Sequence, residues 1–256
     1  MVYYNFLSFL TLLQKEVHRF IKVGIQTVIG PAISSLLFLA VFTLALGKSV
    51  TSIHGVTLAE FIAPGLIMMT MLQNSFANSS SSIGQAKFQG NIVDILMAPL
   101  SNLELTVGYI LGSIARGLIC GIVTTLGILF FIQLQIYSYF ALLFFSFMGC
   151  LMMACLGTIV GIWAEKWDQQ QGITNFVVLP LTFLSGTFYS ISRLPSFWQN
   201  FAAFNPFFYN IDGFRYAFIG KSDSSILLGS IILIIVNAIL LYICYFIFKS
   251  GYKLKS

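Results

Sequence analysis

The chain has 256 residues, of which 58% are hydrophobic and 8% are charged, and its formal net charge is +5. Soluble domains carry about 25% charged residues, so this composition excludes an ordinary soluble protein and indicates an integral helical membrane protein. The length leaves room for about six spans of roughly 20 residues and for no separate catalytic domain. Because the basic residues are scattered and flank the apolar runs, the positive charge does not indicate nucleic-acid binding.

The first part of the chain predicts an interfacial helix followed by a span. Within 1–22, apolar residues from Phe6 to Val17 recur at steps of three and four, and basic residues gather toward the end. This pattern is typical of an amphipathic helix that lies in the membrane surface. The first span is expected over 24–46, with a kink at Pro31.

A second span is expected over 58–82, and its second half is polar, with Gln73, Asn74, Asn78 and a run of four serines. Polar groups are costly against lipid tails, so this face is expected to look into protein or water. Helix packing through small residues explains the serines equally well.

The segment 84–104 is a polar break between spans that still carries apolar residues at helical spacing. Phe88, Ile92 and Ile95 fall on one side of a predicted short helix, and Asp94 faces elsewhere. A proline and a serine are expected to end this helix, and a carboxylate then suits the positive first turn of the next one. These residues are Pro99, Ser101 and Glu104. Such a helix can lie at the membrane surface and be pushed by a soluble partner, whereas the alternative is a loop that only turns the chain around.

Four further spans are expected over 105–132, 139–163, 173–189 and 226–248, the fifth being short and interrupted by proline and glycine. Glycines four residues apart occur in two of these spans, a spacing that lets helices approach closely. They are Gly108 and Gly112, Gly117 and Gly121, and Gly157 and Gly161.

The segment 190–223 is rich in aromatic residues but too broken for a clean span, and it predicts a re-entrant helical hairpin in the outer leaflet. The bend is expected at or near the dipeptide Asn205-Pro206. Asp212 and Arg215 lie one helical step apart and could form an ion pair that pins the hairpin. The hairpin residues singled out are Pro195, Asn205, Pro206, Asp212 and Arg215.

The distribution of basic residues predicts the orientation. With six spans, both termini lie on one side, and that side holds Lys15, Arg19, Lys22, Lys87, Lys166, Lys249, Lys253 and Lys255. The opposite side holds Lys48, Arg193, Arg215 and Lys221. The excess of lysine and arginine places both termini, and the segment 84–104, in the cytoplasm.

The sequence offers little chemistry for an enzyme or a metal site. The two histidines, His18 and His54, lie on opposite sides of the membrane in this topology, and the four cysteines fall in apolar segments. Gly-Lys-Ser occurs at 47–49 and 220–222, but the first glycine of a phosphate-binding loop is missing in both cases. We therefore expect no catalytic residue, no metal site and no cofactor on this chain.

An ion-coupled secondary carrier is the alternative class, with a passive scaffold subunit as a third. Carriers place ionisable residues deep in several spans, and here only Arg116 lies well inside one. Arg116 could extend to the cytoplasmic interface or pair within a polar cavity.

Two stretches of the chain closely resemble motifs of the ABC-2-type transporter permeases. Residues 90–106 are similar to the region after the second span in that family, and 183–220 are similar to its C-terminal signature. The signature pieces stand here as Leu184-Ser185-Gly186, Leu194-Pro195, Asn205-Pro206, and Asp212 with Arg215. The resemblance covers nearly the whole chain, as a single domain over 1–256.

The resemblance implies an all-α integral membrane protein with six transmembrane helices, an N-terminal interfacial helix, a cytoplasmic coupling helix and an outer re-entrant hairpin. It implies the permease subunit of a bacterial inner-membrane exporter for a lipid, drug or glycan-type substrate. A second copy of the chain and two copies of a separate ATPase, which binds ATP and magnesium, are the expected partners, besides membrane lipid. The coupling residues would be Phe88, Ile92, Asp94, Ile95, Leu96 and Pro99.

Residues of the second span are the candidates for a substrate path. Apolar and methionine side chains facing a path would suit an apolar or amphipathic cargo, although such a stripe is also typical of plain packing. The residues singled out are Met68, Gln73, Asn74, Phe76 and Asn78.

Overall fold

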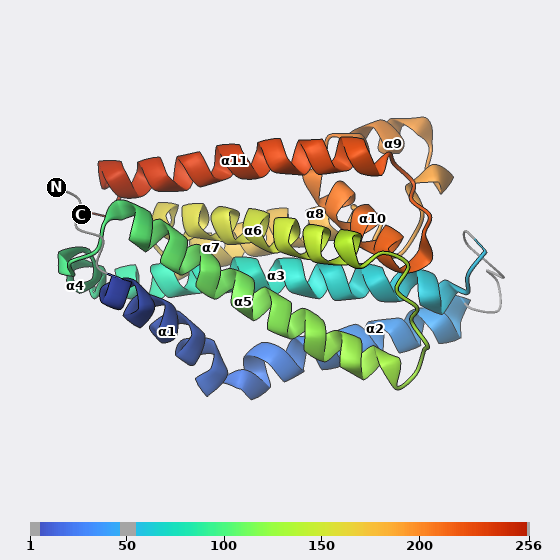
Figure 1. The fold of residues 1–256 in the computed structure, drawn as a ribbon, viewed down its shortest axis with the longest axis horizontal. Coiled ribbons are helices and arrows are strands. Elements are labelled where there is room, and N and C mark those ends of the chain that lie inside the picture. The colour runs from blue at the N-terminus through green and yellow to red at the C-terminus, as the bar shows by residue number, and fades with distance from the viewer. Residues whose placement is uncertain (1–5, 47–54, 255–256) are drawn as a thin grey trace.

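The computed structural model describes residues 6–46 and 55–254 of the chain. Within these ranges the elements are helices, with no β-strand among them, which confirms the all-helical fold (Figure 1). Lys48, His54 and Lys255, which entered the sequence arguments on orientation and metal binding, lie outside the described residues, as does the segment 47–49.

The elements follow one another in a simple order. They are α1 (Phe6–Lys22), the π-helical segment η1 (Ile25–Ile29), α2 (Gly30–Leu46), α3 (Leu58–Phe88), α4 (Ile92–Met97), α5 (Asn102–Leu129), α6 (Tyr139–Trp163), α7 (Trp167–Ile173), the π-helical segment η2 (Thr174–Val178), α8 (Leu179–Phe183), the 3₁₀ turn η3 (Ile191–Arg193), α9 (Ser196–Ala203), α10 (Pro206–Ile219) and α11 (Ile226–Ser250).

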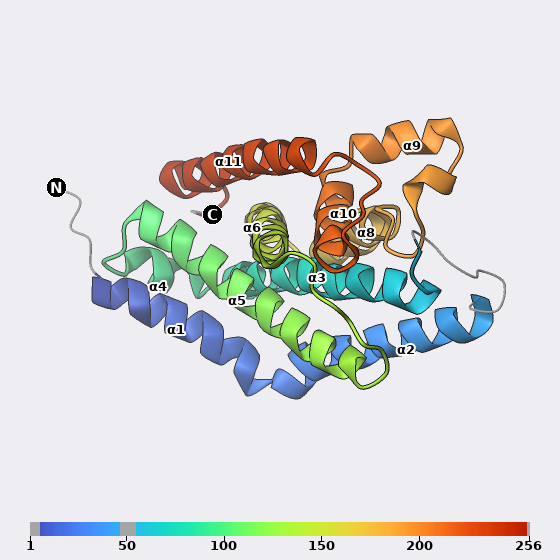
Figure 2. The ribbon, with the colours of Figure 1, turned by 45° about the vertical axis from the view of Figure 1, so that its right-hand side comes forward.

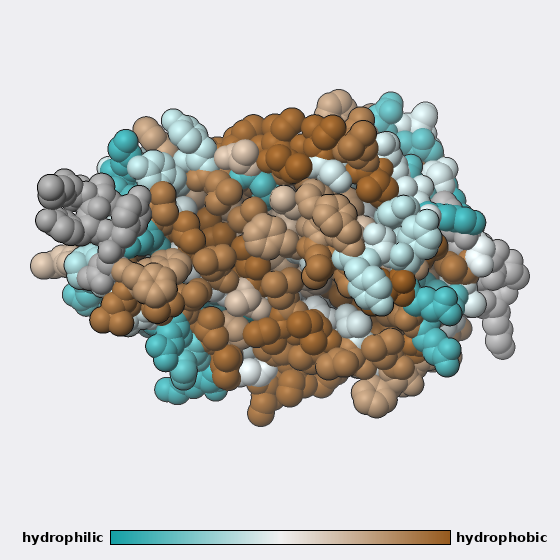
Figure 3. Space-filling model, viewed as in Figure 1, coloured by the Kyte–Doolittle hydropathy of each residue, from teal (hydrophilic) through white to brown (hydrophobic). Residues whose placement is uncertain are grey.

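Four helical segments are long and apolar enough to cross a membrane: Ile25–Ala45, Asn102–Leu129, Tyr139–Trp163 and Ile226–Ser250. Figure 3 shows hydrophobic residues over the middle of one face and hydrophilic residues toward its two ends, as expected for a protein that sits in a bilayer. Helix α3 has 31 residues, which corresponds to a length of about 46 Å, but its polar half keeps it out of this apolar group.

Helix α3 is the centre of the fold. It packs against α6, α5, α2 and α10, and most of its residues are buried (Figures 1 and 2). Helix α1 lies along α5, while α11 and α10 pack against α6. In Figure 1, α4 and the start of α1 lie at one end of the molecule, and α9 lies near the other.

Glycines on the neighbouring helices accommodate the serines of α3. A Cβ atom at Gly117 would overlap the Ser75 hydroxyl, and one at Gly157 would overlap the Ser79 hydroxyl. These serines donate to main-chain carbonyls, Ser75 to Ser113 at 3.2 Å and Ser79 to Ala154 at 2.9 Å. The serines of α3 therefore serve close helix packing, in which small residues face one another.

Each π-helical segment ends two residues before a proline, Pro31 after η1 and Pro180 after η2. In η1 the widened turn closes with a hydrogen bond from the Gly30 amide to the Ile25 carbonyl, next to Pro31. Pro31 has no N–H to donate to the Thr27 carbonyl four residues back, and the Cys120 thiol of α5 donates to that carbonyl instead, at 3.3 Å. The expected irregularity at Pro31 thus takes the form of a π-helical turn.

The predicted position of Phe88 needs correction. Helix α3 continues to Phe88, so Phe88 belongs to α3 and the short helix contains only Ile92–Met97. Gly90, at φ +78°, separates the two helices, since this conformation is open mainly to glycine. The expected start of the next helix is confirmed, because Ser101 and Glu104 form a capping box at the N-terminus of α5.

The fifth predicted span is also shifted. The helix that was expected to begin at 173 begins at Trp167, where Asp168 lies in the first turn, and its regular part ends at Phe183. The polar sequence before 173, expected to be a loop, is therefore largely helical, with Gln170 buried. The following residues form turns as far as η3, with Gly186 at φ +77°.

We predict that Gly157→Val destabilises the protein, because a side chain there overlaps both Ser79 and the main-chain carbonyl of Phe76. Overpacking of this kind costs about 1–3 kcal/mol, which lowers the melting temperature of the protein purified in detergent. Gly172→Ala is the control, since a Cβ atom at Gly172 meets nothing within 4 Å. An unchanged melting temperature for Gly157→Val would contradict the close contact of α3 with α6.

Candidate functional site

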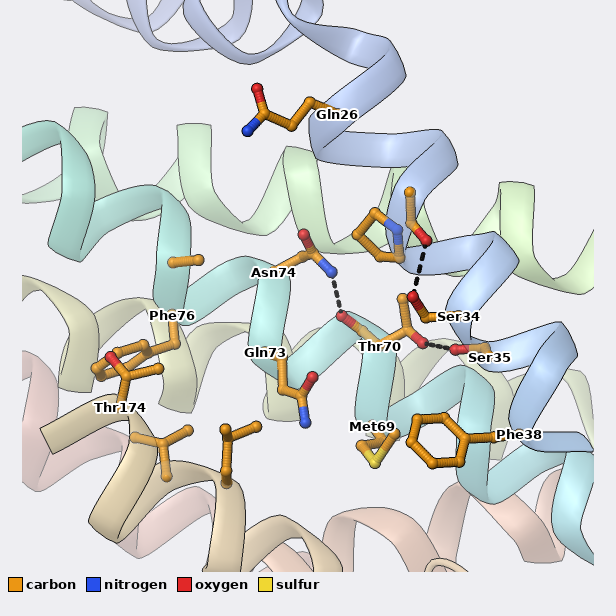
Figure 4. Close-up of a pocket in the computed structure, with 15 residues that line it drawn as sticks. Gln26, Ser34, Ser35, Phe38, Met69, Thr70, Gln73, Asn74, Phe76 and Thr174 are labelled. Carbon is orange, nitrogen blue, oxygen red and sulfur yellow. Dashed lines mark hydrogen bonds between the residues drawn. The ribbon is translucent and has the colours of Figure 1, made fainter. Parts of the chain in front are cut away.

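A cavity of about 430 Å³ lies between α2, α3 and the segment that joins η2 to α8 (Figure 4). Its lining mixes hydroxyl and amide side chains with apolar ones. The lining residues are Gln26, Gly30, Pro31, Ser34, Ser35, Phe38, Met69, Thr70, Gln73, Asn74, Phe76, Ala77, Thr174, Val178 and Leu179.

The polar side chains of the lining are held by hydrogen bonds. Ser35 Oγ and Thr70 Oγ1 are 2.6 Å apart, which ties α2 to α3. Asn74 Nδ2 donates to the Thr70 carbonyl at 2.9 Å, and Gln73 Nε2 reaches Thr182 Oγ1 at 3.4 Å. Figure 4 shows Thr70, Gln73 and Asn74 on α3, with Ser35 of α2 beside Thr70. The arrangement can bind a molecule that has both polar and apolar parts.

Both π-helical segments of the described chain contribute to this cavity. Gln26 comes from η1, and Thr174 and Val178 come from η2. A π-helical turn is wider than an α-helical one and is frequently found at functional sites. The two prolines that follow these turns therefore shape the cavity wall as well as the helices.

Of the five residues predicted for a substrate path, the structure brings three to this cavity and two elsewhere. Gln73, Asn74 and Phe76 line it. Met68 is fully buried against Gly149 of α6, and Asn78 is fully buried in a polar cluster in the C-terminal half of α3. Met68 lies on a different side of α3, whereas Asn78 lies on the same side as Asn74 but one turn further on, where Arg19 and Ser113 bind it.

Sequence reasoning missed the contribution of α2 to the cavity. Gln26, Gly30 and Ser34 stand four residues apart, which places them on one face of an otherwise apolar helix. That polar stripe is the signal from which the wall of the cavity could have been predicted.

Arg116 lies behind the cavity wall. Only 8% of its surface is exposed, and its Nη2 donates to Asn74 Oδ1 at 3.0 Å. Of the two possibilities for Arg116, the structure therefore shows pairing inside the protein rather than extension to the interface.

The end of the molecule that carries α4 presents apolar residues outward. Ile92 is buried against the body of the protein, and Ile95 and Leu96 are half-buried. Asp94 and Pro99 are exposed, while Phe88, on α3, packs edge-on against Trp167 with ring centroids 6.1 Å apart. Val93 and Met97, which sequence reasoning missed, are 51% and 80% exposed.

The exposed pair has a simple sequence signal. Val93 and Met97 are four residues apart and therefore share one face of α4, opposite to the face that holds Ile92. A groove between α1 and the 94–100 segment lies next to a second hollow that α3 also lines, and Lys15, Asp94 and Ile95 line both. Helices α1 and α4 thus form one continuous surface.

A buried polar cluster, the α1 joint, fixes α1 to α3; it consists of Glu16, Arg19, Asn78 and Ser82. Ser82 Oγ donates to Glu16 Oε1 at 2.7 Å, and Arg19 Nε lies 3.6 Å from Glu16 Oε2. Arg19 Nη2 donates to both the carbonyl and the side-chain oxygen of Asn78, each at 2.8 Å. Gly112 of α5 makes room for Glu16, since a Cβ atom there would lie 2.6 Å from Glu16 Cβ.

The predicted ion pair between Asp212 and Arg215 is wrong, because each side chain has separate partners. Asp212 accepts hydrogen bonds from the amides of Asp223 and Ser224, both at 2.9 Å. Arg215 donates to the carbonyls of Phe61 and Gly186, at 3.2 and 2.5 Å, and stacks 4.0 Å from the Phe61 ring centroid. Arg215 is thus buried among helices and is not an outer surface charge.

The bend at Asn205-Pro206 is present as a helix start. Asn205 is the N-cap of α10 and accepts a hydrogen bond from the Phe207 amide at 3.1 Å, with Pro206 in the first position of the helix. Pro195 is itself the N-cap residue of α9, which has no side-chain cap. The short α9 and α10 therefore form a helical pair that packs on α3, α6 and α11 through α10 (Figure 2).

The C-terminal turn is tied to the loop that follows α6. Lys253 Nζ lies 2.6 Å from Glu165 Oε1, and this hydrogen bond lowers the pKa of the exposed Glu165 carboxyl below its ordinary value. Lys87 at the end of α3 donates to the carbonyls of Ile162 and Ala164, at 2.6 and 3.0 Å. Basic side chains thus satisfy the last carbonyls of α6.

Comparison with protein families identifies the family of this chain. Residues 8–219 match the model of the family described as "ABC-2 type transporter". The chain belongs to the ABC-2 type transporter family. Membership makes it a membrane component of an ABC transporter, in which the ATPase is a separate subunit.

Curated relatives support this membership. The chain is 36% identical over 242 residues to the inner membrane transport permease YadH of Escherichia coli strain K12, with 94% of each chain covered. It is 24% identical over 212 residues to nodulation protein J of Rhizobium leguminosarum bv. viciae, with 81% of this chain and 80% of that protein covered. Nodulation protein J of Rhizobium meliloti is 22% identical over 206 residues.

We predict that Glu16→Ala destabilises the ABC-2 permease by about 1–3 kcal/mol, because it leaves Arg19 and Ser82 without their buried acceptor. The measurement is the melting temperature of the purified protein. Lys15→Ala, at a neighbouring position that is half exposed, is the control and should have little effect. The double variant Glu16→Ala/Arg19→Ala should lose less stability than the two single variants lose together. If the losses of stability are strictly additive, the two residues do not interact.

Proposed function

We propose that this chain is the permease subunit of an exporter in the bacterial inner membrane, driven by a separate ATPase that pushes on α4. The observation that carries the proposal is the outward-facing apolar pair Val93 and Met97 on a short helix whose other face, Ile92, is anchored in the protein. Exposed apolar side chains beside polar ones are typical of a surface for another protein. Asp94, Ile95 and Pro99 complete this surface.

The proposed topology has six crossings. Four are the apolar segments described above, and the remaining two are α3 and the segment from α7 to α8. Helix α3 is long enough to cross, and its polar residues are covered by α5 and α6 rather than by lipid. Helices α9 and α10 form the re-entrant hairpin at the outer side. The excess of basic residues near α4 and the two chain ends supports a cytoplasmic location for both termini.

We further propose that two copies of the chain work together and that the substrate passes the cavity between α2, α3 and η2. The mixture of amide, hydroxyl and apolar groups in its wall suits an amphipathic lipid, a drug or a glycan-type molecule. An ion-coupled carrier is the competing proposal. It is less well supported, because none of the residues described as lining the cavity is a carboxylate that could exchange a proton or bind a cation.

Met97→Glu should separate binding of the ATPase from folding. A charge at this 80% exposed position places an unpaired carboxylate in the proposed contact, so association with the ATPase should weaken by about tenfold or more while the melting temperature stays unchanged. Association is measured by co-purification and by stimulation of ATP hydrolysis in proteoliposomes.

Two further variants serve as controls for Met97→Glu. Ile92→Glu buries a charge and should lower the melting temperature itself. Ser196→Glu changes an exposed residue of α9, near the other end of the molecule, and should leave association unaffected. If Met97→Glu binds and couples the ATPase normally, α4 is not the contact.

Labelling of single cysteines should reveal the topology. We expect Asp94→Cys to react with a membrane-impermeant maleimide only from the cytoplasmic side, and Ser196→Cys only from the outside. Both positions are exposed, whereas the four native cysteines are fully buried and contribute little background. Reaction of both introduced cysteines from the same side would overturn the six-span arrangement.

A further inference from the structure

The environment of Arg116 is unusual for a buried charge. Arg116 lies in the middle of an apolar 28-residue helix, and one protein oxygen, Asn74 Oδ1, accepts from its guanidinium group. Its Nε is buried and has no acceptor. Among the described residues, no carboxylate forms an ion pair with it. A guanidinium group has five N–H donors, so most of its hydrogen-bonding capacity is unused.

The other two buried or half-buried arginines have more partners than Arg116, although the Nε of Arg19 also lacks a hydrogen-bond acceptor. Arg19 has the carboxylate of Glu16 and two oxygens of Asn78. Arg215 has main-chain carbonyls from two parts of the chain and an aromatic ring. A buried charge without comparable partners costs several kcal/mol. Arg116 therefore has fewer partners than either Arg19 or Arg215, and it lacks the carboxylate that Arg19 has.

The cavity is the adjacent place where such a counter-charge can sit. Asn74 forms part of the cavity wall, and its Oδ1 accepts a hydrogen bond from Arg116, which does not itself line the cavity. Figure 4 shows the other hydrogen bond of this side chain, from Asn74 Nδ2 to the Thr70 carbonyl. The residues that line the cavity include amides and hydroxyls but no charged side chain. The positive potential of Arg116 thus reaches the cavity without a lining carboxylate to cancel it, in a region of low dielectric constant where charges interact strongly.

We propose that this cavity binds the anionic group, a phosphate or a carboxylate, of an amphipathic molecule, with Arg116 as the counter-charge and Asn74 as the residue that positions it. Hydroxyl and amide groups of the wall supply further donors, and Phe38, Met69 and Leu179 contact the apolar part. The inference deepens the proposed function, on which it rests for the identification of the bound molecule as cargo. Binding itself needs neither ATP nor the partner.

Binding is tested with the purified full-length chain in a neutral detergent. The probes are dodecyl phosphate, dodecanol and dodecyltrimethylammonium, which share one alkyl chain and differ in charge. We expect calorimetric titration to show saturable binding of dodecyl phosphate alone, with a matching rise in melting temperature. Arg116→Gln should weaken this binding by about tenfold or more, since the positive charge beside the cavity is lost, and Arg116→Lys should retain part of it.

Asn74→Asp gives the sharpest variant. It places a carboxylate of nearly the same shape against Arg116 but removes the hydrogen bond to the Thr70 carbonyl, so the protein without ligand should stay folded while binding of dodecyl phosphate is abolished. This combination separates a binding role from a structural one and keeps the test informative if Arg116→Gln folds poorly. Arg193→Gln is the matched control, because it removes the same charge from an exposed position on η3 and should leave binding unchanged.

The outcomes discriminate between the possible sources of the anion. Displacement of dodecyl phosphate by phosphatidylglycerol but not by phosphatidylcholine in nanodiscs identifies a lipid headgroup, and absence of displacement identifies a free amphiphile. Equal binding of dodecanol, or undiminished binding by Asn74→Asp, overturns the inference. Neither result bears on the ATPase contact at Met97, so failure of this proposal is distinguishable from failure of the proposed function.

Discussion

The fold depends on covering the polar half of α3. This helix carries asparagine, glutamine and serine side chains at the centre of a membrane protein, where contact with lipid would leave their hydrogen-bonding groups unsatisfied. Helices α5 and α6 approach closely enough to cover them, because glycines remove the side chains that would intervene. The hydroxyls then donate to main-chain carbonyls, so each helix satisfies polar groups of its neighbour. The close approach of α5 and α6 to α3 and the hydrogen bonding of the α3 side chains therefore depend on each other.

The same helix connects the two ends of the proposed machinery. In its C-terminal half, Asn78 accepts a hydrogen bond from Arg19 of α1, and residues of α1 and of the 94–100 segment line one groove. One helical turn earlier, Asn74 binds Arg116 and lines the cavity. The contacts to the proposed ATPase surface and to the proposed substrate site therefore converge on two neighbouring residues of α3. A rigid shift of α1 with α3 would move both, since the α1 joint is buried and made of charged hydrogen bonds.

Local sequence patterns predicted much of the fold and part of the site. The span at Tyr139–Trp163, the capping box of Ser101 with Glu104 and the helix start at Asn205 depend on neighbouring residues alone, and they agree with the structure. The assignment of Phe88 to the short helix was wrong because Gly90 separates the two helices, and the spacing of apolar residues alone does not reveal such a break. The separation of Gln73 and Asn74 from Met68 and Asn78 required knowing which neighbour each side of α3 meets.

The sequence by itself determined the solvent in which the protein folds, the helical class and the family, because composition, apolar run length and two motifs are properties of the chain alone. Only the tertiary structure decided the partners of the charged residues. Asp212 and Arg215 are neighbours along a helix, yet they bind groups brought from the 223–224 loop, from α3 and from the turn after α8. Arg116 is left with one acceptor beside a cavity. Helix packing decides which groups distant in sequence meet a charged side chain, and the spacing of residues along one helix does not predict that packing.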